Sequence, residues 1–137
     1  MYTRSARWYD NIYSFKNYAR EASIVDGLIR AHGRSPGNRL LDVACGTGEH
    51  LRHLRLHHEV EGLDLDPAML EVARHKLPGI PFHEASMLDF DLGRRFDAVV
   101  CLFSSVGYLG TVERLWRGIA GMARHLEPGG VLLVEPW

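Results

Sequence analysis

The sequence has little cysteine, little lysine and no long hydrophobic run. Two cysteines cannot build a framework of several disulfides, which excludes the small disulfide-stabilised class. The longest apolar run, residues 98–103, is far shorter than the roughly 20 residues that cross a bilayer. Only Lys16 and Lys76 are lysines, the arginines are scattered and the net charge is −1, so we expect no nucleic-acid partner.

The amino-terminal segment also lacks the features of a leader peptide. Residues 1–17 are polar and aromatic and contain no apolar stretch. A chain of 137 residues is long enough for one hydrophobic core. We therefore expect a single soluble domain in the cytoplasm, without a membrane partner.

The apolar pattern alternates between helical and strand spacing along the whole chain. The spacing predicts a helix over 18–32, whose apolar positions include Ile24, Val25, Leu28 and Ile29. A second helix is expected to begin at Glu49, and a third at Asp66 and Pro67. A fourth helix is expected to carry an apolar stripe that includes Leu126, and a turn at 127–130 ends it. Short apolar runs predict buried strands at 39–44, 60–63, 80–84, 96–101 and 131–134. Strands that alternate with helices indicate a doubly wound α/β domain with a parallel sheet.

A glycine-rich turn follows the first predicted strand. In a doubly wound sheet a ligand binds beyond the carboxyl ends of the strands, where the strand order reverses. Gly46 and Gly48 remove side chains that would keep a ligand from the backbone, and the next helix directs its free N–H groups to the same place. Asp64 lies 18 residues after Gly46, and its carboxylate is able to accept both hydroxyls of an adenosine ribose. The pattern predicts a nucleoside site.

A nicotinamide dinucleotide is the rival ligand for this turn. Its fingerprint, G-x-G-x-x-G/A, needs a small third residue, where this chain has Leu51. Glu49 would also place a negative charge beside the pyrophosphate. Both features disfavour an NAD-dependent oxidoreductase, which we keep as a distant alternative.

Several segments resemble a known family. Residues 41–50, LDVACGTGEH, and 62–70, GLDLDPAML, resemble the first two motifs of class I S-adenosylmethionine (SAM)-dependent methyltransferases. Residues 96–109, FDAVVCLFSSVGYL, and 126–137, LEPGGVLLVEPW, resemble the later motifs. With residues 9–22, YDNIYSFKNYAREA, the chain most resembles bacterial N,N-dimethyltransferases that act on nucleotide-linked deoxyamino sugars in macrolide pathways.

The resemblance implies a fold and a cofactor. The fold is a Rossmann-like sheet of five mainly parallel strands in the order 3-2-1-4-5, with helices on both faces. It implies a helical lid over 1–35, a sheet core over 36–137, and the absence of the family's hairpin of strands 6 and 7. On this basis we expect a chain truncated at its carboxyl end, whose last strand is an open edge through which two copies could associate.

The resemblance also assigns roles to individual residues. The turn and Asp42 would hold the methionine part of SAM, Asp64 the ribose, and Leu65 and Met69 would lie against the adenine. Residues 101–104 would line the side where the methyl group leaves. The expected cofactor-binding residues are Tyr13, Tyr18, Asp42, Ala44, Cys45, Gly46, Thr47, Gly48, Asp64, Leu65, Met69, Ser86, Met87, Cys101, Leu102 and Phe103.

In two regions, residues 85–87 and the amino-terminal segment, the sequence pattern leaves alternatives open for the roles of the residues. The family's Gly-Asp-Met motif is Ala85-Ser86-Met87 here, so Ser86 would bind the adenine amine without a charge while Met87 offers its backbone N–H. In the family an amino-terminal helix covers the site, which makes Tyr9, Tyr13 and Tyr18 candidate lid residues; docking of that helix on the sheet explains them equally well.

Methyl transfer is an in-line displacement, so positioning and exclusion of water supply most of the catalysis. We expect the acceptor to be a small molecule, the amine of an amino sugar, and Tyr108 to orient it; packing of a glycine-rich loop is an equal alternative for Tyr108. A second hypothesis is a SAM-binding module without catalysis that pairs through its open edge.

Two clusters of basic residues are interpreted as solvated surface. His50, His53, His57 and His58 have a spacing that could bind zinc, but no carboxylate or cysteine completes the set, and we expect no metal. The pair Arg94-Arg95 is interpreted as a solvated turn rather than a phosphate clamp.

Overall fold

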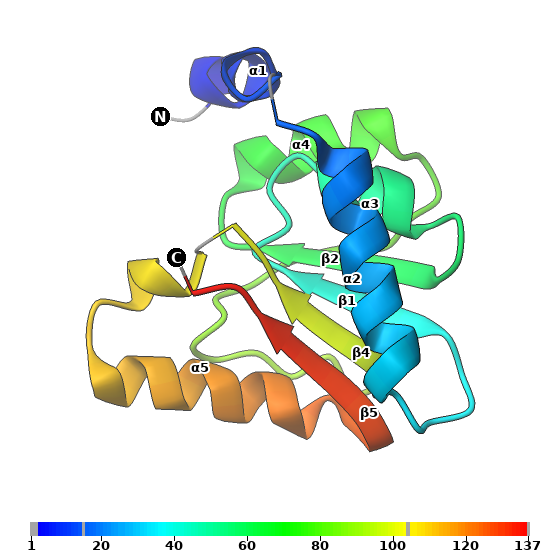
Figure 1. Ribbon diagram of the computed structural model, residues 1–137. Coiled ribbons are helices and arrows are strands. Elements are labelled where there is room, and N and C mark those ends of the chain that lie inside the picture. The colour runs from blue at the N-terminus through cyan, green and yellow to red at the C-terminus, as the bar shows by residue number, and fades with distance from the viewer. Residues whose placement is uncertain (1–2, 15, 104, 137) are drawn as a thin grey trace.

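Five parallel strands form a single sheet in the order β3-β2-β1-β4-β5 (Figure 1). The structure, a computed structural model, describes residues 3–14, 16–103 and 105–136. This order confirms the doubly wound fold, because the chain runs outward from β1 to β3 and then restarts on the other side with β4 and β5. The strands are β1 (Arg39–Val43), β2 (Glu59–Asp64), β3 (Phe82–Glu84), β4 (Phe96–Cys101) and β5 (Leu126–Val134).

Local sequence signals set where the helices begin. Asn17 and Asp66 cap helices by accepting hydrogen bonds from backbone N–H groups three and two residues further on, and Pro67 occupies the first turn, where it leaves no N–H unpaired. None of the helices within the described ranges is both long and apolar enough to cross a membrane. The helices are α1 (Thr3–Ile12), α2 (Tyr18–His32), α3 (Glu49–Leu54), α4 (Pro67–Lys76) and α5 (Val112–Arg124), with one 3-10 turn, η1 (Ser105–Leu109).

Helices cover both faces of the sheet, as expected. One face carries α2, α3 and α4, whose apolar residues pack on alternate positions of the strands such as Leu40 and Val100. The other face carries α5 and η1, which pack on the intervening positions such as Leu41 and Val99. Successive side chains of a strand point to opposite faces, so a strand covered on both sides is apolar throughout.

The last helix and strand differ from the sequence prediction. Leu126 pairs with Phe96 as the first residue of β5, and α5 ends before it, at Arg124. The Glu-Pro-Gly-Gly segment therefore lies inside the strand rather than in a turn. Gly129 adopts a φ of 81°, and the register between β4 and β5 shifts at this point, so the extra residues are absorbed as an irregularity in the strand. Because β5 forms the edge of the sheet, a proline is tolerated there.

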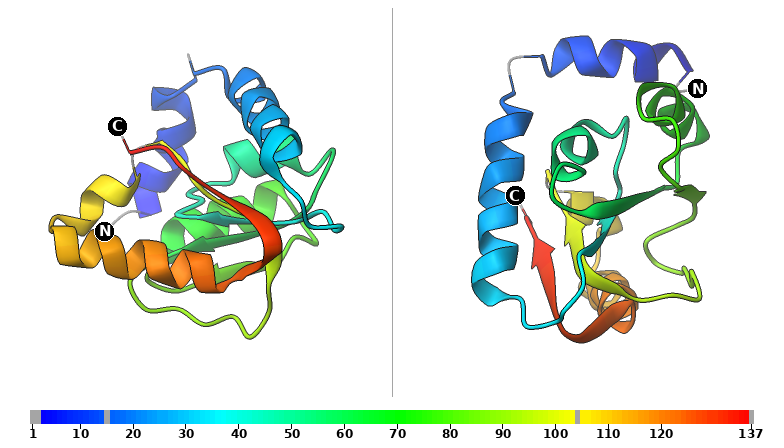
Figure 2. Two further views of the ribbon diagram at one scale, coloured as in Figure 1. Left: turned by 60° about the horizontal axis from the view of Figure 1, so that its bottom comes forward. Right: turned by 90° about the vertical axis from the view of Figure 1, so that its right-hand side faces the viewer.

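The first helix lies apart from the two covering layers. In Figure 2 α1 runs crosswise to α2, beside α4 and above one end of the sheet. Helix α2, by contrast, contributes Ala22, Val25 and Ile29 to the hydrophobic core. Helix α1 is thus placed over the strand ends, and the proposed division into a lid over 1–35 and a core over 36–137 stays a prediction.

Candidate cofactor-binding site

A cavity of about 170 Å³ lies at the carboxyl ends of β1 and β4. The strand order reverses between these two strands, which is where doubly wound sheets bind their ligands. Its walls come from the loops that follow both strands, from α1, and from the first residues of α2 and α3. The lining residues are Tyr9, Tyr13, Tyr18, Asp42, Ala44, Cys45, Gly46, Thr47, Glu49, His50, Leu102, Phe103, Ser105 and Tyr108.

The turn after β1 has an unusual backbone. Ala44 and Gly46 have φ values of 62° and 57°, in the left-handed region that residues with a Cβ rarely adopt. A Cβ on Gly46 would meet no protein atom within 4 Å, so the space beside this backbone is open. Gly48 is different, since a Cβ there would lie 3.0 Å from Leu77 of the neighbouring loop. Gly46 therefore leaves room for a ligand, whereas Gly48 allows the turn to pack on α4.

Two carboxyl groups lie beneath this turn. Asp64, at the end of β2, accepts hydrogen bonds from the backbone N–H of Gly46 (2.8 Å) and of Asp66 (2.9 Å), which fixes the turn against β2. Burial raises the pKa of Asp64. Because Asp64 and Gly46 are 18 residues apart, this pair joins the two loops that the sequence predicted to form the site.

Asp42 is the more unusual of the two acids. Its side chain belongs to β1, is only 2% exposed and borders the cavity. No donor among the described residues lies within hydrogen-bond distance of its carboxyl group. Burial, with a further contribution from the negative charge of Asp64, raises the pKa of Asp42 well above its ordinary value. Among the described residues no fully buried side-chain oxygen lacks a partner, so the oxygens of Asp42 that have no donor open onto the cavity, where a ligand can donate to them.

Aromatic side chains close the opposite side of the cavity. Tyr9 and Tyr13 lie with ring centroids 4.9 Å apart, and Tyr13 meets Phe103 edge-on at 5.1 Å. Burial and the neighbouring phenol of Tyr13 raise the pKa of Tyr9 to about 12, so Tyr9 stays protonated and has a proton to donate. The cavity is therefore covered by rings from the amino-terminal segment.

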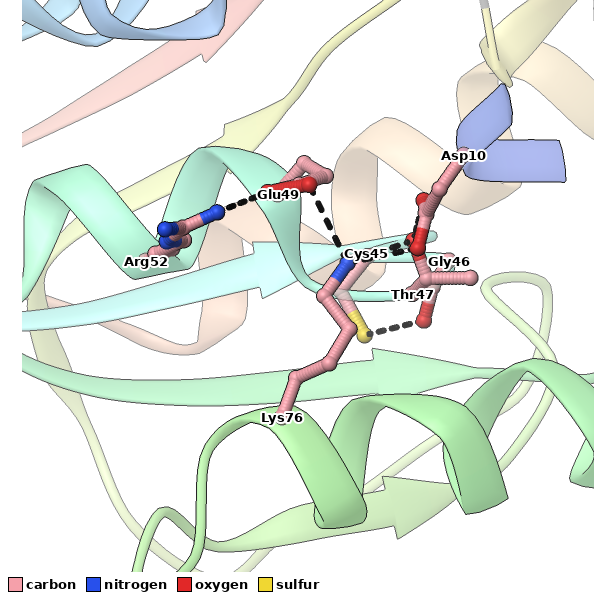
Figure 3. Close-up of polar contacts among 7 residues, drawn as sticks. All are labelled: Asp10, Cys45, Gly46, Thr47, Glu49, Arg52 and Lys76. Carbon is pink, nitrogen blue, oxygen red and sulfur yellow. Dashed lines mark hydrogen bonds and ion pairs between the residues drawn. The ribbon is translucent and has the colours of Figure 1, made fainter. Parts of the chain in front are cut away.

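A polar network ties α1 to the glycine-rich turn, as Figure 3 shows. The hydroxyl group of Thr47 donates to Asp10 (2.6 Å), and the ammonium group of Lys76 donates to the second oxygen of Asp10 (2.8 Å). Lys76 also contacts the hydroxyl group of Thr47 and the carboxylate of Glu49, both at 3.3 Å. Sequence reasoning missed this network, because its members are up to 66 residues apart and no local pattern connects them.

Two of the four histidines interpreted as solvated surface, His50 and His58, are instead packed against α2, whereas His57 is exposed as expected. The ring of His50 is 9% exposed and lies 3.0 Å from Glu21 of α2, and the ring of His58 is 8% exposed and lies 2.8 Å from Asp26. Burial lowers the pKa of His50, partly opposed by Glu21, so its ring is neutral near neutral pH. Helix α3 ends at Leu54, so His57 and His58 follow it in a turn. These two histidines fasten α2 to α3 and to the segment that follows α3.

The interpretation of the arginine pair also needs correction at one position. The guanidinium group of Arg94 lies 2.8 Å from the carboxylate of Glu61, which is buried on β2 and also contacts His83. Arg94 therefore compensates a buried charge, whereas Arg95 is exposed. Neither residue lines the cavity at the carboxyl ends of the strands.

Comparison with known proteins agrees with the geometry. Residues 40–130 match the family model described as a methyltransferase domain, which is more than half of the chain. The chain belongs to this family. It is 52% identical over 124 residues to the dTDP-3-amino-3,4,6-trideoxy-alpha-D-glucopyranose N,N-dimethyltransferase of Streptomyces venezuelae, a match that covers 89% of this chain and 52% of the relative.

Solved structures support the same grouping. The crystal structure of DesVI from Streptomyces venezuelae superimposes with a TM-score of 0.92 at 49% identity, covering 97% of this chain and 57% of that one. SAM-bound CalS10, an amino pentose methyltransferase from Micromonospora echinaspora, gives 0.89 at 50% identity, covering 94% and 56%. The chain thus spans about half the length of the relatives that it matches.

In this methyltransferase domain the predicted cofactor residues fall into two groups. The group that lines the cavity consists of Tyr13, Tyr18, Asp42, Ala44, Cys45, Gly46, Thr47, Leu102 and Phe103. Tyr9 and Tyr108 lie there too, while Ser104 is outside the described residues. Glu49, His50 and Ser105 also line it and were not predicted; of these, Glu49 and His50 directly follow the glycine-rich turn, so their position was a usable signal.

The second group lies around or below the cavity. Leu65 is 66% exposed at the end of β2, and the hydroxyl group of Ser86 accepts a hydrogen bond from the backbone N–H of Leu88. Met87 packs against the core beneath α5, and Cys101 is wholly buried, where desolvation raises the pKa of its thiol to about 12. Met69, partly buried on α4, completes the group together with Gly48 and Asp64.

Proposed function

We propose that the chain is the SAM-binding part of a methyltransferase that acts on the amine of a nucleotide-linked amino sugar. The observation that carries this proposal is the Asp42 carboxyl group, buried at the cavity wall without a donor among the described residues. SAM would provide the missing partner, because it carries an ammonium and a sulfonium group. The names of the relatives, a dTDP-amino sugar N,N-dimethyltransferase and an amino pentose methyltransferase, support the acceptor class.

The residues in and around the cavity match the charges and polar groups of SAM. Each oxygen of Asp64 accepts one backbone N–H and keeps a second lone pair for a ribose hydroxyl group. The open backbone beside Gly46 would receive the methionine part, with its ammonium group at Asp42. The exposed side chain of Leu65 next to Asp64 would cover the adenine ring, with Met69, Ser86 and Met87 behind it.

In this proposal the chain contributes positioning and exclusion of water. SAM supplies an electrophilic methyl group on its sulfonium. Tyr9, Tyr13 and Phe103 shield the cavity from solvent, which strengthens electrostatic interactions inside it. Tyr108 lies on η1 at the cavity rim, 89% exposed, and would orient the acceptor amine. With a pKa of about 12, Tyr9 is a donor and does not remove the proton of the amine.

The acceptor is tested by product detection. The chain is incubated with SAM and with a set of nucleotide-linked amino sugars that differ in the position of the amine, and products are identified by mass spectrometry. We expect a mass increase of one or two methyl groups on an amino sugar, and none on the matched sugars that carry hydroxyl groups in place of the amine. SAM binding without any product would favour the non-catalytic module instead. Association of two copies through the edge strand β5 stays a prediction that a sedimentation experiment would test.

A further inference from the structure

Helix α1 is held over the cavity both by packing, through the buried Ala6 and the ring of Tyr9, and by polar contacts. Two of its large apolar side chains, Trp8 and Ile12, are each 62% exposed and add little to its attachment. Asp10, by contrast, points into the molecule and meets Thr47 and Lys76 (Figure 3). The Asp10–Lys76 pair therefore joins the helix that covers the cavity to α4 and to the glycine-rich turn.

The cavity beneath α1 holds only part of a cofactor. Pockets that bind drug-sized ligands occupy about 300–1,000 Å³. The cavity beneath α1 measures about 170 Å³, too little for a whole nucleoside cofactor. The rest of the cofactor would extend past Asp64 to the exposed side chain of Leu65, while α1 covers the part in the cavity.

We propose that Lys76 is a positioning residue that fastens α1 over bound SAM and thereby limits how fast the cofactor leaves. This inference rests on the proposed function for the identity of the ligand. Lys76 itself lines no part of the cavity and acts through Asp10 and Thr47.

The charges around Lys76 explain why this one side chain has such an effect. Its ammonium group lies between the carboxylates of Asp10 (2.8 Å) and Glu49 (3.3 Å), which would repel each other without it. The three side chains are only 18–26% exposed, so salt screens their interaction less than that of a surface pair. Arg52 also pairs with Glu49, at 3.8 Å. Its side chain is 59% exposed, and this pair lies within α3, so it does not join α3 to α1.

Arg52 therefore provides a matched control. Lys76→Met and Arg52→Met each remove one positive charge and one ion pair to Glu49, but only the first removes the contact with α1. Asp10→Asn keeps an acceptor for the hydroxyl group of Thr47 and removes both the charge and the second oxygen, which accepts from Lys76. The double variant with Asp10→Asn and Lys76→Met completes a thermodynamic cycle, which isolates the energy of the pair.

Two measurements test the proposal separately from the proposed function. Amide hydrogen exchange of residues 3–12 in the ligand-free chain reports opening of α1 without any cofactor. Stopped-flow displacement of S-adenosylhomocysteine by excess SAM reports the dissociation rate. We expect Lys76→Met to accelerate both α1 exchange and dissociation by about tenfold, equivalent to about 1.4 kcal/mol. We expect Arg52→Met to change neither, and the double variant to open no faster than Lys76→Met, because Asp10→Asn also removes the repulsion between Asp10 and Glu49.

The outcomes are distinguishable. The role of Lys76 is supported if Lys76→Met accelerates the exchange of α1 without changing the melting temperature, and if the effects of Asp10→Asn and Lys76→Met do not add in the double variant. Equal exchange in the parent and in Lys76→Met overturns it, whatever the ligand does. If the parent fails to bind either cofactor form, the proposed function is wrong, and the exchange data still decide whether the pair holds α1.

Discussion

Replacing the buried acid of β1 with its neutral isostere, Asp42→Asn, separates the stability of the protein from its ligand affinity. The folded-state pKa of Asp42 is raised by burial, so the folded protein pays a charge penalty above that pKa. The penalty shrinks as the pH falls toward the ordinary value of 3.8, because the carboxyl group becomes protonated in the folded state. Asparagine is neutral throughout and never incurs this penalty.

The magnitude follows from the desolvation of the charge, since a shift of one pKa unit is worth about 1.4 kcal/mol. Asparagine stays polar but never carries the charge, so we expect Asp42→Asn to stabilise the ligand-free chain by about 1 kcal/mol at about pH 8. For a domain of this length that corresponds to a rise of about 3–4 °C in melting temperature. The gain fades at about pH 4. The affinity for SAM falls by about tenfold or more, because the variant loses a charge-assisted hydrogen bond to the ammonium group.

Thermal unfolding between about pH 4 and pH 8 measures the change in stability, and titration calorimetry measures the change in SAM affinity. Glu71→Gln, an exposed carboxylate on α4, controls for the change in net charge and should alter neither quantity. A variant Asp42→Asn that melts below the parent at about pH 8, or a stability difference that does not depend on pH, would refute the reasoning. Unchanged SAM affinity would remove Asp42 from the cofactor site.

Two further substitutions test the packing of the site and its acceptor side. Gly62→Ala places a Cβ 2.7 Å from the ring of Phe82 and 2.8 Å from the sulfur of Cys45, so we expect a loss of about 1–3 kcal/mol in the free energy of urea unfolding; an unchanged midpoint would contradict the close packing. Tyr108→Phe removes an exposed hydroxyl group, so the melting temperature should stay constant while turnover on the amino sugar falls; equal turnover would exclude Tyr108 as the residue that orients the acceptor.

The parts of the fold that the sequence predicted are those with local signals. The helix over 18–32 has the predicted bounds, and Asp66 with Pro67 begins α4 as expected. The strand order 3-2-1-4-5 is confirmed because alternating strands and helices leave few topologies, and the motifs that resemble methyltransferases select among them. The loop that carries Gly46 and the acid Asp64 meet for the same reason, since both follow adjacent parallel strands.

The features that sequence reasoning missed depend on contacts between distant segments. His50 looks like a surface residue on its short helix until α2 packs over it and brings Glu21 within 3.0 Å. The contact of Asp10 with Lys76 needs α1 to lie beside α4, which no periodicity encodes. The start of β5 at Leu126 was missed because Pro128 and two glycines indicate a turn, whereas pairing with β4 accommodates them in the strand.

The central claim is that the cavity at the ends of β1 and β4 binds SAM. Titration calorimetry on the folded chain, with SAM, S-adenosylhomocysteine and NADH as separate titrants, tests it most directly. We predict one site per chain with micromolar affinity for the first two and no heat with NADH. No binding of SAM or S-adenosylhomocysteine at high micromolar concentration, or binding of NADH alone, would contradict the claim.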